Sequence, residues 1–223
     1  GNWTQVNNVL EEALRDSRRM KNPLKELETR TFYILLEWIK GDLTKAIEIA
    51  KELLEDKNKV MTQEIKIRIL TRIASIYFDM GNFPQSLELF EYILKYLESG
   101  SYKYKKFGLL VSCSVMSLTQ LGQIYAEKGN FELAVNYGNQ ALKIATSSPD
   151  VFGQIYALSR VATIFLRKKD FDRALPLLEE SIDLSLQTRS RLLYYPTVNA
   201  LAYTYAKLGN ISKANQHVAE GLK

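Results

Sequence analysis

Apolar side chains along this chain recur at helical spacing, in segments separated by short polar turns. In the first segment, Val6, Leu10 and Leu14 share one face of a predicted helix at residues 3–20. The pattern predicts ten further helices, with ends uncertain by about two to four residues. They are 24–40, 43–56, 62–80, 83–98, 107–128, 131–146, 150–168, 171–187, 190–208 and 211–222.

Four segments resemble one another and align without gaps. They are IASIYFDMGNF at 73–83, LGQIYAEKGNF at 121–131, VATIFLRKKDF at 161–171 and LAYTYAKLGNI at 201–211. The turn positions Gly41, Gly81, Gly129, Lys169 and Gly209 lie 40, 48, 40 and 40 residues apart. This spacing accommodates one helix-turn-helix unit per period, with a first helix A and a second helix B.

Each repeat combines small and aromatic positions that suit close helix packing. Helix A keeps one position small, so that two helices can cross closely: Ala74, Gly122, Ala162 and Ala202. Three residues later, on the same face, comes a ring: Tyr77, Tyr125, Phe165 and Tyr205. Helix B adds a second small contact: Ser86, Ala134, Ala174 and Ala214.

The turns also follow a rule. A glycine ends helix A in a left-handed conformation, and an Asn or Asp then caps helix B. Lys169 replaces the glycine in one repeat. A positive φ there would strain that turn, because a side chain disfavours this conformation.

Together, the small residue, the aromatic ring, the Gly-Asn/Asp-Phe turn and the alanine resemble the tetratricopeptide repeat over residues 24–223. The period of 40 exceeds the usual 34, as in variants that resemble kinesin light chains and bacterial peptide-sensing regulators. The resemblance implies an all-α fold, a right-handed superhelical solenoid of antiparallel helix pairs. Residues 23–223 should form five pairs in one domain, and residues 1–22 an extra helix from an incomplete preceding repeat.

Two regions depart from the repeat. Glu37 occupies the aromatic position of the first repeat, and Trp38 follows it, which predicts an atypical helix. The 48-residue spacing contains an insertion at 99–108, which is either a solvated loop or a basic aromatic contact site. Because the chain starts with a bare glycine and ends within a predicted helix, we expect a piece of a longer protein.

Composition narrows the possible functions. Among 223 residues, no apolar run is long enough to span a bilayer, and no signal peptide opens the chain. Cys113 is the only cysteine, which excludes an internal disulfide and fits a cytoplasmic protein. His217 is the only histidine and has no nucleophile motif beside it, and no Gly-rich phosphate loop occurs. The sequence therefore predicts neither an enzyme nor a metal or cofactor site.

The resemblance implies a protein or peptide partner in a concave groove lined by the A helices. The positions that it places on this face are Arg72, Thr119, Gln120, Gln123, Ser159, Arg160, Thr163, Arg167, Asn199 and Tyr203. Their amides, hydroxyls and guanidiniums suit an extended peptide, with an acidic or carboxy-terminal segment first among the candidates. In the alternative interpretation, the arginines pair with acids such as Glu127 on neighbouring helices and only hold the stack together.

Two other functions remain open from the sequence. The chain could be the peptide-sensing part of a bacterial transcription regulator whose DNA-binding part lies elsewhere. The net charge of +5 and the recurring polar residues Thr71, Thr119, Ser159 and Asn199 also allow an RNA-binding repeat, although acids interleave with the basic residues. No membrane partner is expected, and a homo-oligomer is compatible with the sequence.

Overall fold

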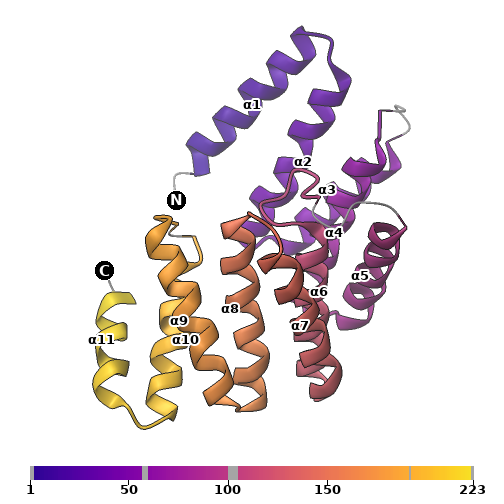
Figure 1. Ribbon diagram of the computed structural model, residues 1–223. Coiled ribbons are helices and arrows are strands. Elements are labelled where there is room, and N and C mark those ends of the chain that lie inside the picture. Colours follow the sequence, from indigo (N-terminus) through magenta and orange to yellow (C-terminus); the bar gives the residue numbers. More distant parts are fainter. Residues whose placement is uncertain (1–2, 57–59, 100–104, 191, 222–223) are drawn as a thin grey trace. The chain divides into compact units, whose positions relative to one another are not determined.

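The computed structural model describes residues 3–56, 60–99, 105–190 and 192–221. Within these ranges the chain forms eleven α-helices and no strand (Figure 1). This confirms the all-helical prediction. The helices are α1 Trp3–Arg19, α2 Pro23–Lys40, α3 Leu43–Glu55, α4 Gln63–Asp79, α5 Phe83–Glu98, α6 Cys113–Glu127, α7 Phe131–Thr146, α8 Val151–Lys168, α9 Phe171–Gln187, α10 Tyr194–Lys207 and α11 Ile211–Gly221.

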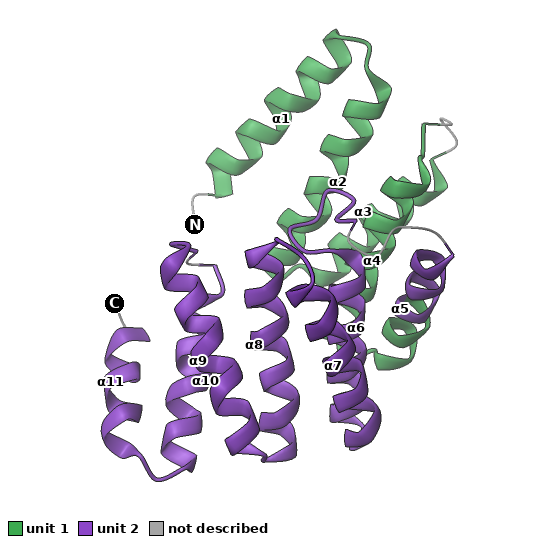
Figure 2. Ribbon diagram, in the orientation of Figure 1, with its two compact units in different colours: residues 1–89 green, residues 90–223 purple. Residues whose placement is uncertain are grey.

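The chain divides into two compact units, residues 1–89 and 90–223 (Figure 2). In the first unit, α2 packs on α3, and α4 contacts both. In the second unit, consecutive helices form the pairs α6/α7, α8/α9 and α10/α11, as the repeat predicts. Helix A of one pair also contacts helix A of the next, through α6 with α8 and α8 with α10. The right-handed sense of the superhelix and the single solenoid domain stay predictions.

The predicted small positions are buried where helices cross. Ala162 and Ala174 have no exposed surface and lie in one apolar cluster with Phe165. A Cβ atom added to Gly122 would lie 2.7 Å from Cδ1 of Ile164. That atom ends a flexible side chain and can move, but the backbone oxygen of Ala134 on α7 would lie only 3.0 Å away, so glycine at this position allows α6 to approach α7 closely.

The predicted aromatic positions differ in depth. Phe165 and Tyr205 are only 3% and 5% exposed and belong to the core of the second unit. Tyr125 is half-buried and stacks on Tyr137, with ring centroids 5.6 Å apart. Full burial of Tyr125, on which a large loss of stability would depend, is therefore not found.

Lys169 adopts the left-handed conformation of the glycine that it replaces. Its φ is 61°, and the four equivalent glycines have φ between 73° and 88°. The amide of Lys169 donates to the Leu166 carbonyl, and the amide of Asp170 donates to the Phe165 carbonyl. The turn thus has the same backbone conformation as in the other repeats, although its left-handed residue has a side chain.

Helix α6 begins at Cys113, six residues later than the predicted start at 107. The reason lies in the backbone, because Phe107 and Gly108 both have positive φ, of 47° and 77°. Ser112 then caps α6, and its hydroxyl accepts a hydrogen bond from the Val115 amide. The insertion residues Tyr102, Lys103 and Tyr104 of the predicted contact site lie outside the described residues.

In the first repeat, a buried, ion-paired carboxylate stands at the position where the other repeats carry an aromatic ring. Glu37 is only 6% exposed, and its carboxylate pairs with the ammonium groups of Lys40 at 3.0 Å and Lys45 at 3.6 Å. Trp38 instead donates from its indole Nε1 to Oδ2 of Asp79 at 2.7 Å. This bond links α2 to α4, one repeat apart.

Candidate functional site

The predicted site residues fall on both sides of the division between the units, and their environments differ. Arg72 belongs to the first unit, on α4. The other nine belong to α6, α8 and α10 of the second unit. Burial separates those that a ligand could reach from those that only hold helices together.

Arg72 is a structural residue. Its side chain is 4% exposed, its guanidinium donates to the Thr31 carbonyl, and it lies over the Phe32 ring at 5.6 Å. Burial, and after it the charge of Arg68, lower the pKa of Arg72 to about 10. The donors of Arg72 are thus directed into the first unit, and its predicted contact with a peptide finds no support in this arrangement.

Thr119 is also unavailable to a ligand. It has no exposed surface, and its hydroxyl lies 2.9 Å from the carbonyls of Val115 and Met116 in its own helix. Thr71 is equally buried. The proposed RNA-reading position is therefore buried in two of the four repeats that suggested it, and RNA binding stays a prediction without support from these two residues.

Gln120 and Gln123 line up on α6 and are 5% and 9% exposed. The Gln123 amide nitrogen donates to the Thr163 hydroxyl on α8 at 2.6 Å, and that hydroxyl donates to the Arg160 carbonyl at 2.6 Å. Because the hydroxyl proton is used in this way, the amide end facing Thr163 must be the NH₂ group. Among the described residues, neither glutamine Oε1 atom has a hydrogen-bond partner.

Such buried acceptors are uncommon and call for an explanation. Leaving one unsatisfied costs about 1–3 kcal/mol. Both Oε1 atoms are buried between the helices, so they do not face a surface that a ligand can reach.

Arg160, on α8, is partly buried, and its guanidinium lies over the Tyr156 ring at 5.3 Å. It forms no ion pair with any carboxylate of the described residues. Ser159 and Thr163 flank it, and both hydroxyls donate into α8, which leaves their oxygens as acceptors. Arg160 is thus a positive charge whose donors are available.

Arg167 differs from Arg160 although it lies on the same helix. Its Nε atom pairs with Oε1 of Glu127 on α6 at 2.8 Å. Both side chains are substantially exposed, so the pair contributes little to stability. For Arg167, the alternative interpretation as a tie between neighbouring helices describes the contact found.

A cleft of about 100 Å³ brings Ser159, Arg160 and Thr163 together with residues that the sequence did not single out. Its other lining residues are Leu178, Leu193, Pro196, Thr197 and Ala200. We call this space the Arg160 cleft. Its apolar wall comes from α9 and the start of α10. In the sequence, only Pro196 in the first turn of α10 could have indicated this wall. The cleft therefore combines one guanidinium with an apolar surface.

Asn199 and Tyr203 lie elsewhere on α10. They line a second cleft, of about 330 Å³, together with α11 residues such as Ala214 and Val218. Tyr203 is 50% exposed, and its ring meets that of Phe171 edge to face at 6.1 Å. The structure thus does not bring Asn199 and Tyr203 into the Arg160 cleft.

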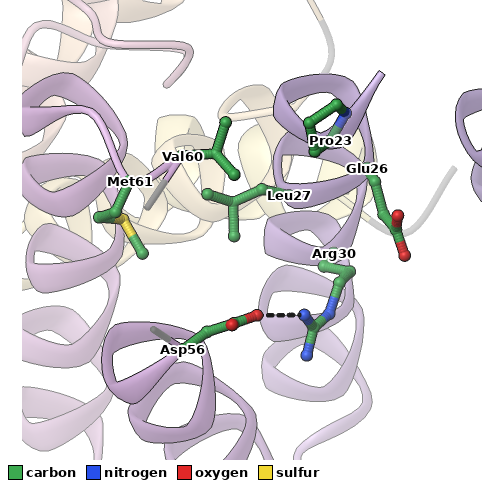
Figure 3. A pocket seen from close by; sticks show the side chains of 7 residues that line it. All are labelled: Pro23, Glu26, Leu27, Arg30, Asp56, Val60 and Met61. Atoms are coloured by element: carbon green, nitrogen blue, oxygen red, sulfur yellow. Dashed lines mark hydrogen bonds and ion pairs between the residues drawn. The ribbon is translucent and has the colours of Figure 1, made fainter. Parts of the chain in front are cut away.

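The first unit also contains a small pocket, shown in Figure 3, of about 100 Å³. Leu27, Val60 and Met61 form its apolar part. Its charged residues are already paired, since Arg30 contacts Asp56 at 2.9 Å and Glu26 contacts Arg18 at 2.8 Å. We assign no binding role to this pocket.

Within the described part of the chain, no group of three or more His, Cys, Asp or Glu residues could hold a metal ion. Cys113 is fully buried, and the His217 ring stacks on Tyr205 and contacts Glu220 at 3.0 Å. No helix of the described residues is long and apolar enough to cross a bilayer.

The fold and its site define a class of protein, the helical-repeat solenoid built from pairs of helices. Tetratricopeptide repeat models match residues 117–147 and residues 157–192. Residues 117–147 and 157–192 thus match the tetratricopeptide repeat, and the helix pairs around them have the same arrangement. Among curated proteins, none matches the sequence.

Solved structures share the fold at low sequence identity. The chain superposes on BtubC (BKLC) from P. vanneervenii with a TM-score of 0.71 and 17% identity, covering 99% of this chain and 90% of that one. On a Rap protein complexed with Competence and Sporulation Factor, the TM-score is 0.81 at 16% identity, and on NprR in complex with its cognate peptide NprX it is 0.72 at 18%. The matches cover 97% and 99% of this chain, but only 58% of the Rap chain and 61% of NprR.

Proposed function

We propose that this chain is a non-catalytic binding module and that the Arg160 cleft receives a carboxylate of an acidic or carboxy-terminal peptide segment. The observation that carries the proposal is Arg160 itself, a partly buried guanidinium without a carboxylate partner among the described residues. A guanidinium grips a carboxylate through two parallel N–H donors. The apolar wall beside it suits the aliphatic part of the same peptide residue.

Ser159, which lines the Arg160 cleft, supports the same ligand. Its hydroxyl donates to the Tyr156 carbonyl, so its oxygen can accept a hydrogen bond from a peptide N–H group. In this proposal a carboxylate of the peptide lies at Arg160 and a backbone amide of the same peptide lies at Ser159.

Packing supports an inner face formed by the A helices. In the second unit, α6 contacts α8 and α8 contacts α10, whereas the B helices α7, α9 and α11 show no contact with one another among the described residues. A two-layer array bends towards the layer whose members lie closer together, as in solenoids that bind along their concave side. Rap and NprR, whose structures contain a bound factor and a cognate peptide, add support by analogy of fold.

The test compares two arginines of the same helix. A random library of free-carboxylate and amidated peptides is screened on the wild-type chain. The selected free-carboxylate peptides are labelled, and fluorescence anisotropy measures their binding. Arg160→Ala should weaken binding about tenfold to a hundredfold, as expected for a lost charged hydrogen bond. Arg160→Lys should recover only part of the loss, because an ammonium group cannot form the two-pronged contact.

Arg167→Ala is the matched control, because it removes an equal charge that is already paired with Glu127. It should change the affinity less than about threefold, with the melting temperature of both variants near that of the wild type. The proposal fails if Arg160→Ala binds as the wild type does, or if both variants lose affinity equally. It also fails if amidated neutral peptides are selected as often as acidic ones.

A second candidate function is a peptide-sensing regulator, favoured by the overlap with NprR over 99% of this chain. In that case the module would form part of a longer protein with a DNA-binding part. The full gene sequence decides this, since a helix-turn-helix segment outside residues 1–223 is required. A gene that ends with these repeats would exclude it.

A further inference from the structure

Another cleft of the second unit, of about 430 Å³, has the features of a small-molecule site and shares no residue with the Arg160 cleft. It lies among α5, α6 and α7, next to the only spacing that departs from 40 residues. Its lining residues are Leu94, Leu97, Glu98, Ser114, Leu118, Gln140, Lys143 and Ile144. A volume of this size falls in the range of ligand pockets. We call it the Ser114 cleft.

The floor of the Ser114 cleft is aliphatic and largely buried. Leu97, Leu118 and Ile144 are 3%, 4% and 8% exposed, and Leu94 is partly buried. These side chains come from three helices, so they form a wall around the space rather than a single stripe. An aliphatic group of a few carbons would remove apolar surface from water at this wall.

Ser114 supplies a polar group within this apolar floor. It is 2% exposed and lines the cleft, and its hydroxyl has no hydrogen-bond partner among the described residues. Forty residues later, the equivalent position carries Gln154, whose amide donates to the Ser148 carbonyl at 2.8 Å. Here α6 therefore carries a small serine without a partner, and its hydroxyl can bind a ligand atom that lies in the cleft in place of water.

The rim of the cleft carries both signs of charge. Glu98 on α5 and Lys143 on α7 are exposed, and neither forms an ion pair with any described residue. A ligand with one carboxylate would match Lys143 but would meet the negative Glu98. A ligand with an ammonium and a carboxylate group matches both.

We propose that the Ser114 cleft binds a free α-amino acid with an aliphatic side chain. The side chain packs on Leu97, Leu118 and Ile144. The carboxylate pairs with Lys143, and the ammonium pairs with Glu98. The Ser114 hydroxyl donates to the carboxylate.

Three probes of similar size test this assignment on the intact chain. They are L-leucine, 4-methylpentanoate, which lacks the ammonium group, and 3-methylbutylamine, which lacks the carboxylate. Saturation-transfer NMR detects binding, and titration gives the dissociation constant, which we expect at about 1 mM for leucine. Each incomplete probe should bind about three- to tenfold more weakly than leucine.

Variants then locate the probe. Lys143→Met and Glu98→Gln should each weaken leucine binding about three- to fivefold, and Ser114→Ala should weaken it by a similar factor without a cavity large enough to unfold the chain. Lys51→Met, which removes an exposed lysine of α3 in the other unit, is the control and should leave the affinity unchanged. Circular dichroism melts confirm that each variant is folded.

Three results would overturn the proposal. One is the absence of leucine binding at about 10 mM, a concentration that would reveal even a weak site of this size. The second is equal binding of the three probes, and the third is leucine binding that is unchanged in Lys143→Met and Glu98→Gln. Because the Arg160 cleft shares no residue with this one, each of these results leaves the peptide proposal standing.

Discussion

Replacing Lys169 by glycine should stabilise the protein, although it removes a whole side chain. Lys169 has φ of 61° at a turn where the other four repeats carry glycine. Its amide and that of Asp170 close the turn onto the Leu166 and Phe165 carbonyls, and glycine keeps both bonds. The Lys169 side chain is exposed and forms no ion pair with a described residue, so few contacts are lost.

The magnitude follows from two opposing terms. Holding a residue with a Cβ atom in the left-handed region costs about 1–2 kcal/mol. Glycine loses more conformational entropy on folding than lysine does, which reduces the gain in stability by about 0.5–1 kcal/mol. We therefore expect a gain of about 0.5–1 kcal/mol for Lys169→Gly, or a rise of about 1–4 °C in the melting temperature.

Urea denaturation followed by circular dichroism measures this difference. Lys169→Ala is the matched control, because it removes the same charge and keeps the Cβ atom, so its stability should equal that of the wild type. Gly129→Ala, at φ of 77°, should show the opposite effect and lose about 1 kcal/mol. Equal changes for Lys169→Gly and Lys169→Ala would refute the reasoning, because backbone strain would then contribute nothing.

Three further substitutions test the packing of the second unit. Phe165→Ala should lower the free energy of unfolding by about 3–5 kcal/mol in urea denaturation, since the ring is 3% exposed, and a loss below 1 kcal/mol would contradict its place in the core. Gly122→Ala should cost about 1–3 kcal/mol, because the new Cβ atom would lie 3.0 Å from the backbone oxygen of Ala134 and would also displace Cδ1 of Ile164; an unchanged melting temperature would disprove the close crossing. Burial, and then the hydrogen bond to Glu179, raise the pKa of Tyr205, so its stabilising contribution is full below pH 10 and is lost as the pH rises through the raised pKa. In denaturation at several alkaline pH values, the free energy of unfolding should therefore fall more steeply with pH for the wild type than for Tyr205→Phe. Parallel curves would contradict the link between Tyr205 ionisation and stability.

Much of the fold could be predicted from the sequence, because a solenoid repeats one local solution. The small positions, the turn residues and the helix pairs each follow from side-chain size and backbone conformation within about 40 residues. The start of α6 could not be predicted in this way. It depends on positive φ at Phe107, a residue type that rarely adopts it.

The site was predicted less well, because a helical row does not reveal which of its members neighbouring helices cover. Thr119 and Arg160 both fit the inner positions of the repeat. Thr119 is fully buried, whereas Arg160 reaches a cleft. The Ser114 cleft could not be predicted from the sequence. It depends on the space left between three helices and on a serine without a hydrogen-bond partner, and neither feature leaves a pattern in the sequence.

The polar links between successive A helices have a mechanical consequence. Gln123 with Thr163, and Glu127 with Arg167, join α6 to α8 at two heights, one turn apart on each helix. The Gln123–Thr163 bond is part-buried and carries most of this link, whereas the exposed ion pair adds little to it. A ligand that separates α6 from α8 would have to break the Gln123–Thr163 bond, whereas no such polar link joins α8 to α10 among the described residues. We therefore expect a wide ligand to separate α8 from α10 more easily than α6 from α8.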